Sequence, residues 1–414
     1  MLPEHTNVVN HGLTDIAVLA TAASFILYLF SKKVRHSAIW KATVTPLASI
    51  IGSGFLVVTP LYILILGKYA LLAIIGMVCV AYMAGYVIRY NIDHVEPKMQ
   101  YKTHWPLLAE MERLSYLALA VAYLISIPFY IKLLSLFLLR GIHMQNEIVS
   151  NITATCILAS IGLIGIARGF EKLELMEEYS VSIKLAMIFA MMVGLLIYNV
   201  DLLLGNQWRL HIVTPLFDTT TLRQLLGTFI IVQGFETSRY LGLNYSPETR
   251  VKTMRFAQVL SGVIYVSFVA LSMVIFSEKI DVSETVVIDL SERISNVLPA
   301  LMIIAAIMSQ FSASVADIVG SGGLISEASA SRLKPNRNYF IIAIISIVIT
   351  WSADIFSIIA LASRAFAFYY AVQAAEAVLI ARRNVTDFRS LMSLVIFVLM
   401  LLLMSAVTIF GISL

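Results

Sequence analysis

Long apolar stretches alternate with short polar segments along almost the whole chain. A helix that crosses a bilayer needs about 20 predominantly apolar residues, and the pattern therefore predicts an all-α integral membrane protein with about 12 transmembrane helices. The short segment at 339–353 is expected to gain a few residues at each end. The predicted spans are 13–31, 42–66, 69–91, 116–139, 149–167, 178–200, 222–243, 256–277, 296–322, 339–353, 355–381 and 390–412.

Composition agrees with this assignment. The 414 residues are 59% hydrophobic and only 13% charged, with a mean hydropathy of +0.88, and a soluble domain could not bury so much apolar surface. Cys79 and Cys156 lie in apolar stretches and are interpreted as small buried hydrophobes. The sequence carries no metal-ligand cluster, phosphate-binding loop or nucleophile motif. We therefore expect neither a cofactor nor an enzyme.

The basic residues predict the orientation in the bilayer. The loops that we assign to the cytoplasmic side hold 19 lysines and arginines, and the opposite loops hold 6. This bias follows the positive-inside rule and places both termini outside a cytoplasmic (inner) membrane. No basic residue precedes the first span, whereas Lys32, Lys33 and Arg35 follow it. That order is the reverse of a secretory signal peptide. Because the lysines and arginines gather mainly in the loops of one face, the net charge of +4 gives no reason to expect a nucleic-acid partner.

Two apolar segments are interrupted by glycine. One contains Gly52-Ser53-Gly54 and the other contains Gly234, about half a chain later. A helix that breaks inside the bilayer exposes backbone groups that lipid cannot satisfy, so such breaks must line a cavity. Two breaks at matching places predict a transporter built from inverted repeats. Simple packing of small residues between helices is the alternative interpretation of these glycines.

The breaks divide the chain into two units of five spans. Because five is odd, the second unit is inverted relative to the first. The predicted organisation is an N-terminal outward tail with an extra transmembrane helix (1–39), a first five-helix repeat (40–200), an external connection (201–221), a second inverted repeat (222–383) and a C-terminal transmembrane helix (384–414).

Several motifs resemble the amino acid–polyamine–organocation (APC) superfamily. The segment Ile51 to Phe55, with Pro60 after it, resembles the signature of the first core helix, and Gly234-Phe235-Glu236 resembles that of the sixth. Ser182-Ile183-Lys184-Leu185 resembles the fifth core helix of proton-linked members, and 323–333 resembles the end of the eighth. The resemblance implies a leucine-transporter-like fold, in which core helices 1, 2, 6 and 7 rock against 3, 4, 8 and 9. Most relatives lack a span before the first broken helix, and many have one more at the end.

The breaks suggest how a substrate would bind. Free N–H groups of Ser53, Gly54 and Phe55, at the positive end of a half-helix, suit a carboxylate. Carbonyls at the break near Gly234 suit an ammonium group. The candidate substrate-binding residues are Ile51, Gly52, Ser53, Gly54, Phe55, Gln233, Gly234, Phe235, Glu236 and Tyr130.

Three of these residues have alternative interpretations. Glu236 is either a gating or proton-carrying carboxylate, a contact to a cationic substrate, or the partner of Arg239 in a structural ion pair one helical turn away. Phe235 and Tyr130 are either pocket residues or packing aromatics.

The coupling ion has two candidate sites. Ser309 and Ser312, with Asp317 nearby, offer oxygen ligands for sodium, although serines are also common packing residues. In the relatives that it resembles, a lysine at the position of Lys184 places its ammonium where sodium would otherwise sit and can exchange a proton. Asp317 is a candidate counter-charge, and snorkelling to the interface is the alternative for Lys184. We favour proton coupling or exchange over sodium, and assign no role to Lys132 or Arg364.

The sequence thus predicts a secondary active transporter that moves an amino acid or related small amine across the cytoplasmic membrane by alternating access. One alternative is a sodium-coupled symporter of the same fold for a nucleobase or organic cation. Another is a non-transporting membrane sensor or partner subunit. No metal is assigned beyond the sodium alternative at Ser309 and Ser312.

Overall fold

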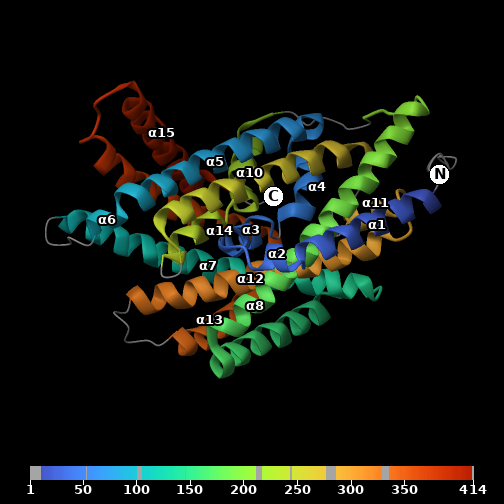
Figure 1. Cartoon of the computed structure of the whole chain (residues 1–414), viewed down its shortest axis with the longest axis horizontal. Helices are drawn as coiled ribbons and strands as arrows, with labels where there is room; N and C mark the ends of the chain where they lie inside the picture. Colours follow the sequence, from blue (N-terminus) through green and yellow to red (C-terminus); the bar gives the residue numbers. More distant parts are fainter. Residues whose placement is uncertain are drawn as a thin grey trace.

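The computed structural model describes residues 11–52, 54–99, 105–144, 146–210, 217–242, 245–276, 286–328 and 335–412. These residues form helices, with no strand among them (Figure 1). The first half contains α1 (His11–Leu29), α2 (Lys32–Arg35), α3 (Ala38–Ile50), α4 (Gly54–Leu66), the 3-10 turn η1 (Gly67–Tyr69), α5 (Ala70–His94), α6 (Glu96–Met99), α7 (Pro106–Gly141) and α8 (Glu147–Leu204). The second half contains α9 (Thr219–Gly227), the 3-10 helices η3 (Phe229–Val232) and η4 (Phe235–Leu241), α10 (Pro247–Ser272), η5 (Met273–Ile275), α11 (Val286–Ser291), α12 (Leu298–Ala328), α13 (Pro335–Ser352), α14 (Ile355–Ala381) and α15 (Phe388–Phe410).

Nine helical stretches in the described part of the chain are long and apolar enough to cross a membrane, and two of them lie in the one helix α8. One of these stretches, 38–98, contains two of the predicted spans, and the predicted span 339–353 corresponds to the shorter helix α13. The all-α membrane architecture is confirmed. The count of twelve spans and the boundaries of the two repeats stay predictions.

Two expected elements differ from the structure. The spans 149–167 and 178–200 were predicted with a loop between them, but both belong to the continuous helix α8, which Figure 1 draws as two arms at an angle. A broken helix was expected at 222–243, but its α-helical part, α9, ends at Gly227. Two 3-10 helices, η3 before Gly234 and η4 after it, take the place of the remainder. Short 3-10 segments of this kind occur where a helix is under local strain or at a functional hinge.

The helices form a buried centre and a lipid-facing periphery. In the apolar window of α7, 78% of the residues are buried, whereas the windows of α1 and α15 are only 22% buried. The central helix α7 packs against α12 and α14, and α12 also packs against α8. Because α1 and α15 are covered on one side only, the remaining apolar surface of both faces lipid. The site must therefore be sought between the central helices.

Polar residues start several helices at the predicted loops. The Ser246 hydroxyl accepts a hydrogen bond from Thr249 N, and Pro247 follows at the first helical position of α10. Asp387 forms a capping box at the start of α15. Such caps pair backbone N–H groups that would otherwise face the membrane interface without a partner.

Tyr339 of α13 is wedged between two glycines of neighbouring helices. A Cβ at Gly165 of α8 would lie 2.9 Å from the ring of Tyr339, and a Cβ at Gly322 of α12 would overlap the same ring. We predict that Gly322→Ala lowers the stability by about 1–3 kcal/mol, because the ring is held on both sides and cannot move away. Thermal unfolding in detergent measures this.

The neighbouring residue provides the control. A Cβ at Gly323 meets nothing within 4 Å, and replacement of a helical glycine by alanine favours the helix by about 1 kcal/mol. Gly323→Ala should therefore melt at or above the wild-type temperature. Equal melting temperatures for the two variants would show that the Tyr339 contact does not constrain the packing.

Candidate functional site

The first interruption separates α3 from α4. Helix α3 ends at Ile50 and α4 begins at Gly54. The carbonyl oxygen of Ile51 accepts hydrogen bonds from Lys184 Nζ (2.7 Å) and Ser309 Oγ (2.6 Å), and that of Gly52 lies 3.2 Å from Ser309 Oγ. Side chains of α8 and α12 thus satisfy carbonyl groups that the end of α3 leaves free. The predicted Ser53 lies outside the described residues.

The second interruption is centred on Gly234. Its φ of +119° is in the left-handed region, which favours glycine. The Glu236 carboxylate accepts a hydrogen bond from the Gly234 N–H (2.9 Å) and is also bound by the hydroxyls of Tyr123 (3.3 Å) and Tyr370. Glu236 is fully buried. A buried carboxylate is therefore held at the break by one backbone and two phenol donors.

The two interruptions lie against each other. A Cβ at Gly54 would be 2.6 Å from Ile231 Cγ2, and a Cβ at Gly234 would be 2.6 Å from Ile50 N. The Tyr265 hydroxyl lies 2.9 Å from the carbonyl oxygen of Ile50 and 2.8 Å from that of Ile231. One side chain from α10 thus bridges the ends of both half-helices. The two breaks are thus in direct contact in this structure.

Tyr130 and Gln233 lie between the interruptions. The ring of Tyr130 is 3.5 Å from the Cβ position of Gly52, and its hydroxyl accepts a hydrogen bond from Gln233 Nε2 (3.3 Å). Tyr130 is therefore in contact with both breaks. Gln233 Oε1 is buried and has no hydrogen-bond partner. An unpaired buried acceptor is costly, and a donor group of a ligand or a bound cation would relieve that cost.

Lys184 is completely buried among neutral oxygens. Its Nζ donates to the carbonyls of Ala48 (2.9 Å) and Ile51 (2.7 Å) and to Ser312 Oγ (3.0 Å). The carbonyls at a helix C-terminus carry partial negative charge, which favours a cation. The Lys184 side chain therefore does not snorkel to the interface, which was the alternative interpretation. The structure brings Lys184 together with both candidate sodium-ligand serines, Ser309 and Ser312.

Asp317 does not contact Lys184 in this structure. One of its carboxylate oxygens accepts a hydrogen bond from Ser126 of α7, and the residue is fully buried. The suggested counter-charge role therefore has no contact to support it. Ser314 is likewise apart from the lysine, because its hydroxyl donates to the Phe311 carbonyl on its own helix.

Both aromatic neighbours of the breaks pack within the core. Phe55 contacts the rings of Tyr265 and Phe268, and Phe235 stacks on Tyr370 with centroids 5.2 Å apart. Both phenylalanines are nearly fully buried. Of the two interpretations of Phe235, the packing one describes this conformation.

Arg239 is not the partner of Glu236. Its guanidinium instead contacts Glu112 (2.9 Å), Glu376 (3.6 Å) and Glu96 (3.7 Å). Glu236 and Arg239 therefore do not form the ion pair that was one interpretation of Glu236, although the two residues are only three positions apart in the sequence. Residues three apart lie on the same face of a 3-10 helix such as η4, so the winding does not explain the difference. Residues of α7 and α14 bind each of the two side chains instead.

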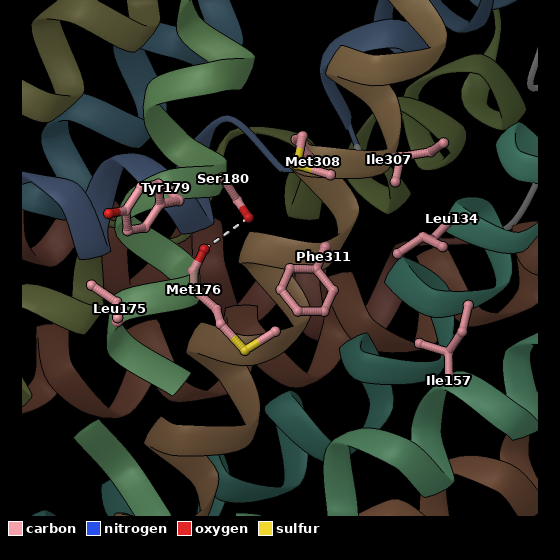
Figure 2. Close-up of a pocket in the computed structure, with 9 residues that line it drawn as sticks. All are labelled: Leu134, Ile157, Leu175, Met176, Tyr179, Ser180, Ile307, Met308 and Phe311. Carbon is pink, nitrogen blue, oxygen red and sulfur yellow. Dashed lines mark hydrogen bonds between the residues drawn. The ribbon is translucent and has the colours of Figure 1, made fainter. Parts of the chain in front are cut away.

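A cavity of about 490 Å³ lies away from the interruptions. It is an apolar space between α7, α8 and α12, and its Ser180 hydroxyl already donates to the Met176 carbonyl (Figure 2). Between the breaks, Gly54 and Ile231 are in direct contact, so the hollow expected there is filled by protein at this point. In this conformation the helix ends at the first interruption pack directly against those at the second.

Lys132 and Arg364 make structural contacts. Lys132 Nζ donates to the carbonyl of Ala353, just after α13 (3.0 Å), and lies 3.8 Å from Glu147 at the start of α8. Arg364 Nε donates to the Thr408 carbonyl (2.7 Å) and so joins α14 to α15. Neither residue lies at the interruptions.

Three tyrosines of the site were not found from sequence: Tyr123, Tyr265 and Tyr370. The hydroxyl of Tyr265 binds carbonyl groups at the ends of both half-helices, and those of Tyr123 and Tyr370 bind the buried Glu236 carboxylate. A tyrosine in the middle of an apolar span is the available signal, since its hydroxyl needs a partner there. The chain has 18 tyrosines, however, and sequence does not say which ones face a break.

Comparison with known proteins identifies the family. A family model described as APC superfamily transporter matches residues 32–411. The chain belongs to the APC superfamily of transporters. A protein from Aquifex aeolicus (strain VF5), described as uncharacterized, is 44% identical over 368 residues, which cover 87% of this chain and 89% of that protein. The resemblance carried by the motifs around Gly54 and Gly234 is thereby confirmed.

Solved structures of other transporters share the fold. A Na+-coupled sialic acid symporter in a substrate-bound outward-open state has a TM-score of 0.54 at 11% identity, over 97% of this APC transporter and 99% of that chain. Mhp1, a nucleobase-cation-symport-1 family transporter in a closed conformation with bromovinylhydantoin bound, has a TM-score of 0.50 at 13% identity, over 89% and 90%. The predicted leucine-transporter-like fold is confirmed. At these identities the similarity carries the fold alone.

The backbone of Gly234 generates a prediction for this APC transporter. Gly234→Ala should lower the melting temperature, because a left-handed conformation costs a residue with a Cβ about 1–2 kcal/mol and the new Cβ would also press on Ile50 and Ser49 of α3. Gly242→Ala, at the other end of η4, is the matched control. Its φ is −62° and its nearest neighbour is 3.6 Å away. Wild-type stability of Gly234→Ala would contradict the packing described for the two breaks.

Proposed function

We propose that the protein is a secondary active transporter that moves an amino acid or related small amine across the cytoplasmic membrane by alternating access, with the proton as the coupling ion or by exchange. The supporting observation is the juxtaposition of two helix interruptions, Ile51–Gly54 and Gly234, in a member of the APC superfamily. Separation of the two would open a space lined by backbone groups. Such groups recognise the parts that all amino acids share.

The start of α4 would hold the carboxylate. Helix α4 is 13 residues long, and the positive end of its dipole points at the break before Gly54. Because Gly54 has no side chain, a ligand could approach the backbone N–H groups closely. Ile231 occupies this position in the present conformation. Binding would therefore require Ile231 to move away with its half-helix.

Gln233 would help to hold the ammonium group. Its Oε1 is buried and lacks a donor, while its Nε2 is engaged by Tyr130. An ammonium group supplies three donors, and one of them would satisfy this oxygen. Tyr130, in contact with both breaks, would then form a side of the pocket.

Lys184 would carry the coupling proton. A protonated lysine fills the space among Ala48 O, Ile51 O, Ser309 and Ser312 with its own positive charge. These four oxygens would otherwise resemble a site for a hard cation such as sodium. If α3 moved during the cycle, the ammonium would lose two carbonyl acceptors at once. Loss of these acceptors would favour release of the proton.

Sodium coupling is the second candidate function, favoured by the serine hydroxyls beside the break. Proteoliposome uptake with sodium replaced by choline at constant pH separates the two candidates. Complete loss of uptake would defeat proton coupling, and unchanged uptake would defeat sodium coupling. A thermal-shift screen against amino acids, polyamines and nucleobases identifies the substrate class to use.

We predict that Gly54→Leu abolishes ligand binding while the protein still inserts in the membrane. The leucine side chain would fill the space in front of the α4 N-terminus and cover the backbone N–H groups. Gly76→Leu is the matched control, since Gly76 lies on α5 with nothing within 4 Å of its Cβ position. The measurement is the ligand-induced shift of melting temperature. Wild-type affinity in Gly54→Leu would exclude this site.

We also predict that Lys184→Ala flattens the pH dependence of transport and makes the protein responsive to sodium. Removal of the ammonium leaves the carbonyls of Ala48 and Ile51 and the two serine hydroxyls free to bind a cation. Sodium chloride, compared with choline chloride, should raise the melting temperature of this variant and leave that of the wild type unchanged. An unchanged pH profile would remove Lys184 from the coupling mechanism.

A further inference from the structure

A second group of buried charges lies at the end of η4 opposite to Gly234. It joins five charged residues from five elements: Glu96 of α6, Glu112 of α7, Arg239 of η4, Arg250 of α10 and Glu376 of α14. The ends of these helices were all predicted to face the cytoplasm. This set, called here the gate cluster, holds the ends of separate helices together on that side. It has no part in the substrate site described above.

The charges of the gate cluster form two layers. In the outer layer, Arg250 makes two bonds to the Glu96 carboxylate, at 2.9 and 2.6 Å, and 27% of the Glu96 side chain is exposed. In the inner layer, Arg239 Nη2 contacts both oxygens of Glu112, at 3.0 and 2.9 Å. Each of these carboxylates therefore has an arginine of its own. Paired charges of this geometry neutralise one another.

Glu376 is the third carboxylate and has no arginine of its own. Its Oε2 lies 3.6 Å from Arg239 Nη1, which also donates to Gln373, and it accepts a hydrogen bond from Gln373 Nε2 (3.2 Å). Its Oε1 is buried without a hydrogen-bond partner. The side chain is completely inaccessible to solvent, and Glu112 beside it is 4% exposed. An ionised carboxylate in such a place is strongly disfavoured.

The two inner carboxyl groups are close to each other. Both contact the same guanidinium, Glu112 at Arg239 Nη2 (2.9 Å) and Glu376 at Arg239 Nη1 (3.6 Å). Two carboxylates that share a site cannot both remain ionised at little cost. We propose that Glu112 and Glu376 bind one proton between them while the gate cluster is closed, and release it to cytoplasmic water when the cluster opens. The ligand is a proton, and the bond that breaks on opening is its O–H bond to the carboxyl pair.

No second cation among the described residues contacts Glu376 in place of this proton. Arg239 is the one cation that contacts Glu376 among the described residues, and it is already bound to Glu112. Helix α5 contributes the neutral amide of Asn91, which donates to Gln373, and α14 itself contributes Tyr369, whose hydroxyl pairs with that of Tyr240. With Arg250 bound to Glu96, the gate cluster carries three carboxylates and two guanidinium groups. One proton makes the cluster neutral.

The proton site deepens the proposed function, because it adds a second protonatable group to the one at Lys184, but it does not depend on the substrate. The sign of its pH effect follows from linkage. The closed protein holds a proton that an exposed carboxyl group does not hold above about pH 5. Raising the pH must therefore favour the open or unfolded protein, by up to about tenfold in the equilibrium constant per pH unit for a single proton.

The test compares Glu376→Gln with the wild type in thermal melts of the purified protein across a pH series. Glutamine is neutral and of the same shape, so it needs no proton. We expect the wild-type melting temperature to fall relative to that of Glu376→Gln as the pH is raised above about 5. Parallel curves would overturn the proposal. The matched control is Glu96→Gln, which removes a carboxylate that already has an arginine, and its curve should follow the wild type.

Infrared spectroscopy supplies a readout that does not require unfolding or transport. A protonated carboxyl group has a C=O stretching band that an ionised one lacks. At neutral pH, Glu376→Gln should lack the part of this band that comes from one protonated carboxyl group. Glu112→Gln should lack it too, and this variant replaces the first one if Glu376→Gln does not fold. Retention of the full band in both variants would overturn the proposal. Failure of the proposed amino acid transport would leave both measurements unaffected.

Discussion

Backbone groups freed in the middle of a membrane protein must find partners within the protein, and this constraint accounts for the centre of the structure. Three side chains meet it: Lys184 at the end of α3, Tyr265 across both breaks, and Glu236 at Gly234. Each comes from a different element. The interrupted helices are thus held in place by hydrogen bonds that can be exchanged for others, including those of a ligand. A continuous helix, with every backbone group paired internally, offers no such exchange.

The glycines could be predicted and their partners could not. Gly54 and Gly234 lie in long apolar runs, and glycine is the residue that most readily lets a helix break there. Both now stand in close contact with the opposite half-helix. Partner choice depends on how separate helices rotate against each other. For this reason the sequence left an ion pair between Glu236 and Arg239 open as one interpretation, whereas tertiary packing gives Arg239 the carboxylate of Glu112. Likewise, α8 continues through a polar segment where local composition favoured a loop. The family motif predicted that Lys184 lies near the first break, but only the folded structure shows which groups accept its hydrogen bonds.

The short helix η4 connects the proposed substrate site to the gate cluster. It begins after Gly234, carries Glu236 in its first turn and ends close to Arg239. Because Glu236 is bound by Tyr123 and Tyr370, and Arg239 by Glu112 and Glu376, both ends are fixed to α7 and α14. A shift of η4 would therefore disturb hydrogen bonds at the centre and ion pairs at the gate together. Physical coupling between the two sites needs a rigid element of this kind with two arrangements.

Two buried ionisable groups lack a partner of opposite charge of their own, and both are therefore candidates for proton exchange. Lys184 is a cation whose described acceptors are neutral oxygens, and Glu376 is a carboxyl group without an arginine of its own. Both side chains are inaccessible to solvent. For each of them, a change of protonation costs far less free energy than a buried charge without a partner. In the proposed cycle, the first would lose its acceptors when α3 moves, and the second would meet water when the gate cluster opens. Proton exchange at either position would then be tied to a change of conformation, which is the condition for moving a solute against its gradient.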